Sequence, residues 1–323
     1  PHLFQNDINY QRAGLIISKS VCKKIKSPRA DMMQAFSEFA PLIFPLIANL
    51  CKECEDYLLL NYCYHCLSRL LKNLTENEIA EQLLQEYGEI YYGRFMSLNT
   101  NFPSNVDENF PFIKFLIEGI KFLIRISRKL DNEQIENVIQ FLQSIFQLPA
   151  HKYLVIVKAK AISLLNSMII KNKRYDVFES HMQLIMEIIF SQIMLSDEDI
   201  QDMENDPESF IQENPSANIN WEDDKASCSH FLLNCVDKMK NTSLIDYIYE
   251  TASSLLQSES RNQIFTAFHI LTTAVSENCK NHFEQFLPFL LEAFNHPDFV
   301  VRAGSFFVLS ATKCCTISQQ IID

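Results

Sequence analysis

The sequence has little glycine, only 5 of its 323 residues. β-Sandwiches, β-barrels and Rossmann-type turns need backbone positions with positive φ, which glycine occupies at low cost. The scarcity of glycine therefore argues against these folds. The chain is nevertheless 47% hydrophobic, so it has enough apolar material to bury a large core.

Motifs of known catalytic centres are also absent from the sequence. There is no HExxH, GxSxG, P-loop or glycine-rich phosphate loop, and none of the 8 histidines stands beside a Ser or Cys in a nucleophile motif. A calcium loop of the EF-hand type needs a central glycine, and no glycine lies between Gly119 and Gly304. We therefore expect a protein that is not an enzyme and that holds no cofactor.

Long apolar runs and targeting signals are missing as well. The longest run, near Leu42–Leu50, is interrupted by Pro45 and Asn49, and none reaches the roughly 18 residues of a membrane span. No signal or transit peptide opens the chain, which starts at Pro1 inside a helical pattern, so we expect an internal fragment. With a pI near 5.2 and no basic stripe, direct binding to nucleic acid is disfavoured.

The 10 cysteines are scattered, which in a long chain is typical of a reduced cytosolic or nuclear protein. Cys51 and Cys54 form one CxxC pair, and Cys63 and Cys66 form another with His65 between them. Zinc could use four such ligands. However, a spacing of three within an apolar helix puts Cys63 and Cys66 on one buried face, where a free thiol packs as a small hydrophobe. We therefore predict no metal site and mostly buried thiols.

Apolar residues recur at intervals of three and four along nearly the whole chain, which predicts helices throughout. Asp131, with Gln134 three residues later, is predicted to cap one helix, and Pro41 and Pro45 are predicted to kink another. The predicted helices cover about 7–24, 28–51, 55–72, 75–98, 110–130, 131–148, 150–171, 175–195, 224–240, 244–257, 261–279, 282–295 and 298–314.

The last two predicted helices form the most informative pair. The first carries an apolar stripe with Pro288 inside it, a short turn follows with Asp298 as the N-cap, and the second opens with Val301-Arg302. This order resembles a HEAT repeat. Counted in this way, the chain holds one half and six full helix pairs, and we predict that residues 1–323 form a single all-α, armadillo-like, right-handed HEAT-repeat solenoid.

Basic residues are absent between Arg174 and Lys225, where fourteen acids occur. Eleven of these acids lie in the segment 196–224, which joins the two helices of one predicted repeat as an insertion. Outside residues 175–224 the chain is close to neutral, with 28 basic and 26 acidic residues. One interpretation is a solvated loop that keeps the protein soluble, and the other is a contact surface for a basic partner.

We develop the second interpretation and expect seven carboxylates to form the contact surface. They are Asp197, Glu198, Asp199, Asp202, Glu204, Asp206 and Glu208. Trp221, the only Trp, belongs to the same segment and is either a loop anchor or a contact residue. The sequence around Asp206-Pro207-Glu208, with Phe210 and Ile211, suggests a short helix docked back on the array, which would hold the acids in place.

The stretch from His181 to Ile211 resembles the importin-beta (karyopherin-beta) superfamily, nearest its branch of importin-7, importin-8, importin-11 and exportin-2. In that branch a helix ends in an apolar run, an acidic segment follows, and then come Asp-Pro-Glu, an aromatic and an aliphatic residue. Here the last five are Asp206, Pro207, Glu208, Phe210 and Ile211. Met203 stands where the family usually has Trp.

The resemblance implies a monomeric nuclear transport receptor that shuttles between cytoplasm and nucleus through the nuclear pore. Its implied partners are the Ran GTPase, Phe-Gly nucleoporins and basic protein cargo such as histones or ribosomal proteins, with no nucleic acid and no membrane. Ran-GTP would set cargo loading and release. Two alternatives stay open: a HEAT scaffold or regulatory subunit of a larger complex, and the helical array that precedes a large kinase domain.

Overall fold

The structure is a computed structural model that describes residues 7–24, 30–73, 78–97, 109–148, 152–206, 224–239, 241–274 and 280–311. Within these ranges all regular secondary structure is helical and there is no strand, which confirms the all-α prediction. The chain divides into two compact units, residues 1–164 and 165–323, which we describe separately. The single continuous solenoid over 1–323 stays a prediction.

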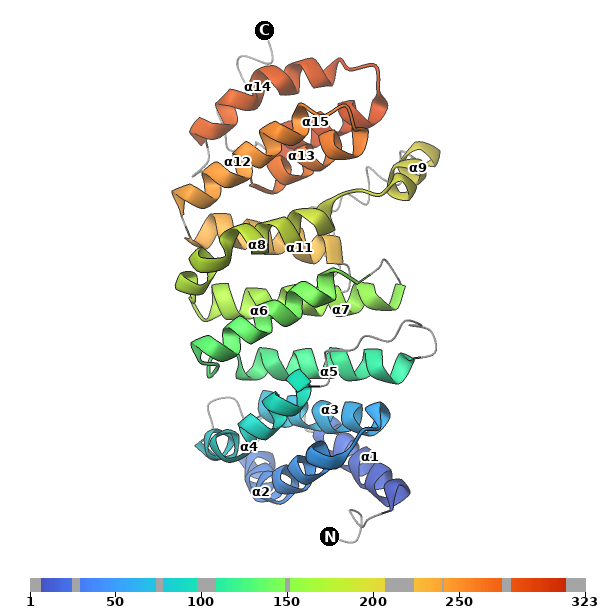
Figure 1. Ribbon diagram of the computed structural model, residues 1–323, viewed down its shortest axis with the longest axis vertical. Coiled ribbons are helices and arrows are strands. Elements are labelled where there is room, and N and C mark those ends of the chain that lie inside the picture. Colours follow the sequence, from blue (N-terminus) through green and yellow to red (C-terminus); the bar gives the residue numbers. More distant parts are fainter. Residues whose placement is uncertain are drawn as a thin grey trace. The chain divides into compact units, whose positions relative to one another are not determined.

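The first unit stacks its helices in two rows. Helices α1, α3 and α5 pack on one another in sequence, and α2 packs on α4 and α4 on α6 (Figure 1). Alternate helices meet in this way when antiparallel pairs stack as repeats, which is the HEAT-type arrangement. The helices are α1 Ile8–Lys24, α2 Ala30–Glu53, α3 Tyr57–Asn73, α4 Glu78–Ser97, α5 Phe110–Ile126, α6 Asn132–Phe146 and α7 Lys152–Leu165.

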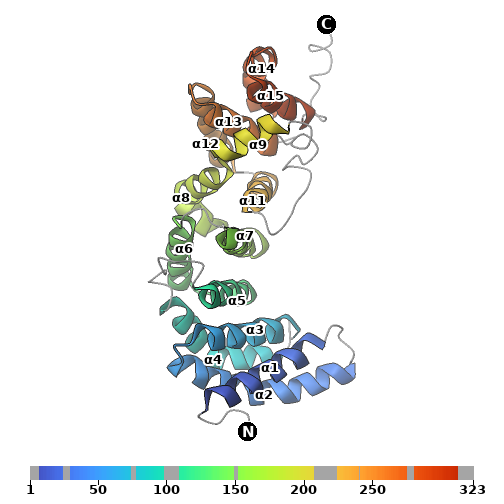
Figure 2. The ribbon, with the colours of Figure 1, turned by 90° about the vertical axis from the view of Figure 1, so that its right-hand side faces the viewer.

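The second unit has the same kind of stacking. Helix α11 packs on α13 and α13 on α15, while α8, α12 and α14 pack on α11, α13 and α15 respectively (Figure 2). The two helices that flank the acidic segment, α8 and α11, therefore pair as predicted. The elements are a π-helical turn η3 Asn166–Lys171, α8 Tyr175–Ile193, α9 Asp197–Asn205, α11 Asp224–Met239, α12 Thr242–Leu256, α13 Arg261–Ala274, α14 Lys280–Phe294 and α15 Phe299–Ala311.

Helix ends follow the capping residues that the sequence predicted. The Oδ1 atom of Asp131 accepts from the backbone N of Gln134 at 2.8 Å, and the Gln134 side chain accepts in return from the Asp131 backbone N at 3.1 Å. Asp298 accepts from the backbone N of Val300 at 2.8 Å at the start of α15. These side chains satisfy amide groups that the first turn of a helix leaves without partners.

Helix α2 is one helix of 24 residues that contains both Pro41 and Pro45, and the kink predicted at these prolines stays a prediction. Another helix differs from its prediction. The helix predicted over 150–171 changes to a π-helical turn after Leu165, and Lys173 then adopts a positive φ of 56°. A π turn inserts one extra residue into a helix without changing the apolar content of the sequence, so hydrophobic periodicity does not reveal it.

One apolar stretch is longer than predicted from the sequence. Residues Tyr153–Lys171 are apolar enough over 19 residues to match a membrane span by length and composition, so the expectation that no run reaches this length is wrong. Of its most apolar window, 67% is buried inside the structure. The core helix of a folded protein has the same character, because it too must be apolar on most sides.

Aromatic side chains fill the seam between α3, α4 and α5. The ring of Tyr64 lies 5.6 Å from Phe95, 5.5 Å from Phe115 and 5.6 Å from Phe122, and all four side chains are fully buried. The Tyr64 hydroxyl donates to the carbonyl of Tyr91 at 2.6 Å, which satisfies its one polar atom inside the core. Such clusters contribute packing beyond the apolar area they bury.

Gly119 allows α5 to approach this cluster. A Cβ atom built on Gly119 would lie 1.8 Å from a ring carbon of Phe95, far inside contact distance. A Cβ on Gly88, in α4, would meet nothing within 4 Å. Only the first of these two helical glycines is therefore required by close packing.

We predict that Gly119→Ala destabilises the protein by about 1–3 kcal/mol, because a methyl group overpacks the seam against Phe95. Gly88→Ala is the matched control and should stabilise it by up to about 1 kcal/mol, since alanine is the better helix former. Urea unfolding followed by circular dichroism measures both changes. Equal effects of the two substitutions would contradict the tight packing at Gly119.

Candidate functional site

The acidic segment begins with a short helix, α9, that is docked on the second unit. Leu195, before α9, and Ile200, within it, are 9% and 5% exposed and belong to a buried cluster with Phe265, Val300 and Phe307 from α13 and α15. The sequence predicts a docked helix with Phe210 and Ile211 near it, but these two residues lie outside the described residues. Leu195 and Ile200 provide the apolar anchor in the part that the structure describes.

Polar contacts add to this anchor. The Nζ atom of Lys225 lies 2.6 Å from Oδ2 of Asp199, which also accepts from the backbone N of Ser196 at 2.7 Å. Arg261 forms an ion pair with Glu204, and Asn262 donates to Oδ1 of Asp197 at 2.7 Å. Three of the predicted contact carboxylates are therefore bonded to neighbours in the same unit.

The structure describes the other predicted contact residues only in part. Asp206 is exposed directly after α9, while Glu198 and Asp202 belong to α9 without a described side chain. Glu208 and Trp221 lie outside the described residues, so the alternatives for Trp221 stay as they were. The contact role of all eight stays a prediction.

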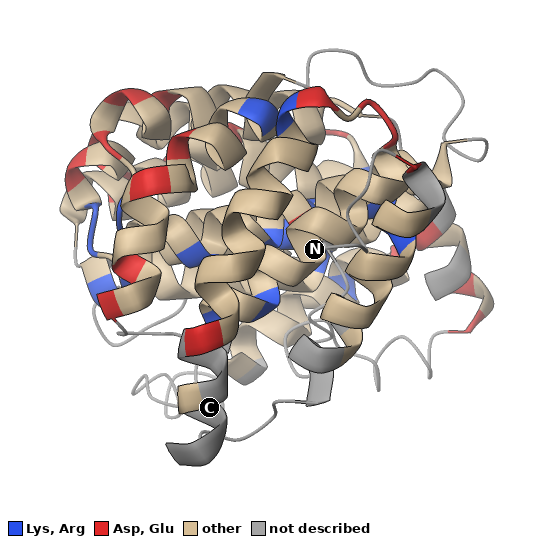
Figure 3. Ribbon diagram, turned by 90° about the horizontal axis from the view of Figure 1, so that it is seen from below, with Lys and Arg blue, Asp and Glu red and all other residues tan. Residues whose placement is uncertain are grey.

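Charge nevertheless remains in excess around α9. Six carboxylates occur between Asp197 and Asp206, and the described ion pairs oppose them with two basic side chains, Lys225 and Arg261. Arg261 also binds Asp298 at 2.7 Å, so its charge is shared. The docked helix therefore keeps a net negative charge at a fixed place on the unit. Most of the ribbon in Figure 3 is tan, which shows how sparse charged residues are along the helices.

We predict that Ile200→Ala releases α9, because it removes the buried anchor that holds this helix to α15. Truncating a buried Ile costs about 2–5 kcal/mol, more than a nine-residue helix gains from its own hydrogen bonds. Hydrogen exchange over 197–205 should then accelerate strongly. Gln201→Ala, at the neighbouring exposed position, is the control and should leave the exchange unchanged. Slow exchange in Ile200→Ala would show that the ion pairs alone hold α9.

The ion pair of Asp199 predicts a dependence on pH. Burial raises the pKa of Asp199, but hydrogen bonds from Lys225 and Ser196 outweigh it and hold the pKa below its usual value. The pair therefore stabilises the fold above about pH 4, and the stabilisation is lost as the pH falls through the lowered pKa.

We accordingly expect Asp199→Asn to lower the unfolding free energy by about 0.5–1 kcal/mol at pH 7, because the pair is about one-third exposed. The difference from the parent should shrink towards pH 3 in urea unfolding. Asp237→Asn removes the same charge at an exposed position of α11 and serves as control. A difference that persists unchanged at pH 3 would rule out the ion pair as its cause.

The cysteines of the two CxxC pairs are largely buried, as predicted. Cys51, Cys63 and Cys66 are fully buried, and Cys54 is half-buried. A hydrogen bond to Cys51, together with burial, raises the pKa of the Cys63 thiol and favours its protonated form, whereas zinc binds the thiolate. Among the described residues, no group of three or more His, Cys, Asp or Glu is placed to hold a metal ion. The absence of zinc stays a prediction.

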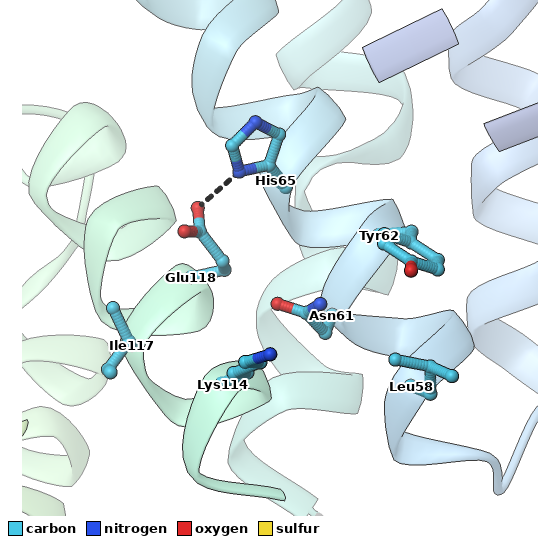
Figure 4. A pocket seen from close by; sticks show the side chains of 7 residues that line it. All are labelled: Leu58, Asn61, Tyr62, His65, Lys114, Ile117 and Glu118. Atoms are coloured by element: carbon cyan, nitrogen blue, oxygen red, sulfur yellow. Dashed lines mark ion pairs between the residues drawn. The ribbon is translucent and has the colours of Figure 1, made fainter. Parts of the chain in front are cut away.

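A groove on the first unit was not found from the sequence. It follows the seam where α5 packs on α3, and Figure 4 shows side chains of α3 facing Lys114 and Glu118 of α5. One part has a volume of about 310 Å³ and is lined by Leu58, Asn61, Tyr62, His65, Lys114, Ile117 and Glu118. The next part shares His65 and Glu118 with it, so the two adjoin.

The second part, which we call the basic groove, has a volume of about 290 Å³ and extends to α7. Its lining contains five basic side chains and one carboxylate, that of Glu118. The residues are His65, Ser68, Arg69, Lys72, Glu118, Lys121, Ile124, Arg125, Lys160 and Ser163. The signal in the sequence was a polar stripe at intervals of three and four on each helix, but only packing shows that the stripes meet.

Glu118 is already bonded within the protein. Its carboxylate lies 3.2 Å from Nδ1 of His65 and 2.8 Å from Nζ of Lys121. Burial raises the pKa of Glu118, but the hydrogen bonds from His65 and Lys121 outweigh it, and the pKa stays below its usual value. The single carboxylate of the basic groove is therefore ionised, and its charge is shared by these two neighbours.

Comparison with known proteins finds a match only among solved structures. No family model matches the chain, and no curated protein matches its sequence. Among solved structures, the chain is similar to the karyopherin Kap121p bound to the extreme C-terminus of the protein phosphatase Cdc14p, with 14% identity and a TM-score of 0.44. The match covers 97% of this chain and 34% of that one, so the chain spans about a third of that protein's length. A likeness this distant does not extend to partners or activity.

Proposed function

We propose that the chain is part of an importin-type nuclear transport receptor, a non-enzymatic protein that carries cargo through the nuclear pore under the control of Ran-GTP. Two observations support this function. The stretch from His181 to Ile211 resembles the corresponding segment of the importin-beta superfamily, and both units consist of stacked helices of the HEAT type. Stacked helical repeats offer broad surfaces that suit protein partners.

The observation that carries the proposal is the docking of α9. An acidic segment that only kept the protein soluble would need no fixed position. Here Ile200 is buried, and Lys225 and Arg261 hold two carboxylates, so the negative charge of α9 has a defined place. Charge fixed before binding loses less entropy on association than charge on a mobile loop. This arrangement favours a basic protein partner, either cargo or Ran.

Phe-Gly nucleoporins are the other partners that the function requires, and they would bind in apolar slots between helices. The receptor would act as a monomer in cytoplasm, nucleus and pore. The competing candidate is a HEAT scaffold or regulatory subunit, for which the same helical stacking is the support. The acidic helix favours the receptor, because uniform scaffold repeats have short turns at this position.

The test neutralises four acids of the segment other than Asp197, Asp199 and Glu204, whose bonds to the fold are described above. This variant, which we call the α9 variant, combines Glu198→Gln, Asp202→Asn, Asp206→Asn and Glu208→Gln. We expect it to bind a fluorescent Lys/Arg-rich peptide and purified Ran-GTP about tenfold more weakly at low salt, because each lost charge removes a steering and pairing interaction. The loss should fade at high salt, where exposed charges are screened.

The control neutralises four exposed acids of the first unit, Glu53, Glu55, Glu86 and Glu133, and so changes the net charge equally. It should keep the affinity of the parent. Unchanged binding by the α9 variant would show that the segment only keeps the protein soluble. Equal losses in both variants would assign the effect to net charge alone.

A further inference from the structure

The basic groove concentrates positive charge in a chain that is strongly negative overall. The protein has a net charge of −12 and 40 acidic residues, yet the groove holds Arg69, Lys72, Lys121, Arg125 and Lys160 against Glu118 alone. Glu118 is engaged by Lys121 and His65. No carboxylate of the described residues other than that of Glu118 lines this groove.

Two of these basic residues repel one another. Burial, together with the positive charge of Arg69, lowers the pKa of Arg125, although its side chain remains exposed to solvent. Among the described residues, neither arginine has a carboxylate partner within ion-pair distance. Two guanidinium groups in this position destabilise the free protein slightly, and an anion between them would remove that cost.

The other lining groups suit the recognition of carboxylates. Each guanidinium can bind a carboxylate through two parallel hydrogen bonds. Ser68, which is 6% exposed, adds a hydroxyl group from α3, whereas the Ser163 hydroxyl on α7 already donates to the carbonyl of Ala159 at 2.9 Å. Three helices thus supply donors around a volume of about 290 Å³, which is enough for two or three acidic side chains and too little for a folded domain.

The adjoining part of the seam differs in character. Leu58, Tyr62 and Ile117 line a volume of about 310 Å³ together with Asn61 (Figure 4). Asn61 is 7% exposed, and it lines this part of the groove. A side-chain amide there can pair with a peptide backbone, which offers both a donor and an acceptor. Apolar side chains beside it would take an apolar residue of the same peptide.

We propose that the basic groove binds an acidic peptide segment of a protein partner, with Asp or Glu side chains between Arg69 and Arg125 and an apolar residue beside Tyr62 and Ile117. A nucleic acid fits the surface less well. Its backbone carries charge over a long distance, whereas this groove is short. The proposal does not depend on the transport function, since it concerns another surface and a partner of opposite charge.

The experiment measures fluorescence polarisation of a labelled twelve-residue peptide that contains six Glu and one Leu, titrated with the protein at 50 and 300 mM salt. The groove variant combines Arg69→Gln and Arg125→Gln. The matched control combines Lys52→Gln and Lys129→Gln, which removes two charges at exposed positions of the same unit. Circular dichroism confirms that each variant is folded.

We expect the groove variant to bind the peptide about tenfold more weakly at 50 mM salt, and the control to stay within about twofold of the parent. A peptide with Ala in place of Leu should also bind more weakly, which tests the apolar part. Parent-like binding by the groove variant overturns the proposal, and so does an equal loss in the control, which would reflect net charge only. A single-stranded oligonucleotide of equal charge that binds more tightly through the same arginines would overturn the choice of a peptide.

Binding of the Lys/Arg-rich peptide to the groove variant separates this proposal from the transport function. The groove variant should bind that peptide like the parent, because α9 is unchanged. If the acidic peptide does not bind, only the proposal for the basic groove is contradicted. If the basic peptide does not bind, only the proposed transport function is contradicted.

Discussion

The structure depends on the burial of apolar helix faces that no helix pair can cover alone. The seam between α3 and α5 shows this most clearly. Nine residues of α5 are buried, and the rings of Tyr64, Phe115 and Phe122 close the space between the two helices. Gly119 permits this approach, since any side chain there would enter the ring of Phe95. The repeat character of each unit follows from the same requirement.

The same burial decides where charged residues gather. Because the inner faces of the helices are largely apolar, Lys158 is the only charged side chain that is buried among the described residues. On the rim of the α3–α5 seam, the stripe containing Arg69 meets the stripe containing Arg125. In the second unit, the buried Ile200 holds a carboxylate-rich helix in place. A chain of net charge −12 thereby presents one basic and one acidic surface, each on a different compact unit.

Much of the fold could be predicted from the sequence, because helical periodicity and capping are local. Asp131 and Asp298 cap the helices that they were expected to cap. Properties that depend on tertiary packing could not be predicted. The basic groove joins residues up to about a hundred positions apart, and α9 is anchored by Ile200, which has no distinguishing feature in an acidic stretch. The apolar content of 153–171 was underestimated because three lysines mark it as polar while their neighbours are buried.

The central claim is that the acidic surface at α9 binds a basic partner and that the basic groove binds an acidic one. The most direct test measures four affinities, those of the α9 variant and the groove variant for one basic and one acidic peptide, each peptide titrated separately. The account predicts that the α9 variant binds the basic peptide more weakly and the acidic peptide with the affinity of the parent. The groove variant should bind the acidic peptide more weakly and the basic peptide with the affinity of the parent. Parallel losses, in which either variant weakens both peptides alike, would contradict it.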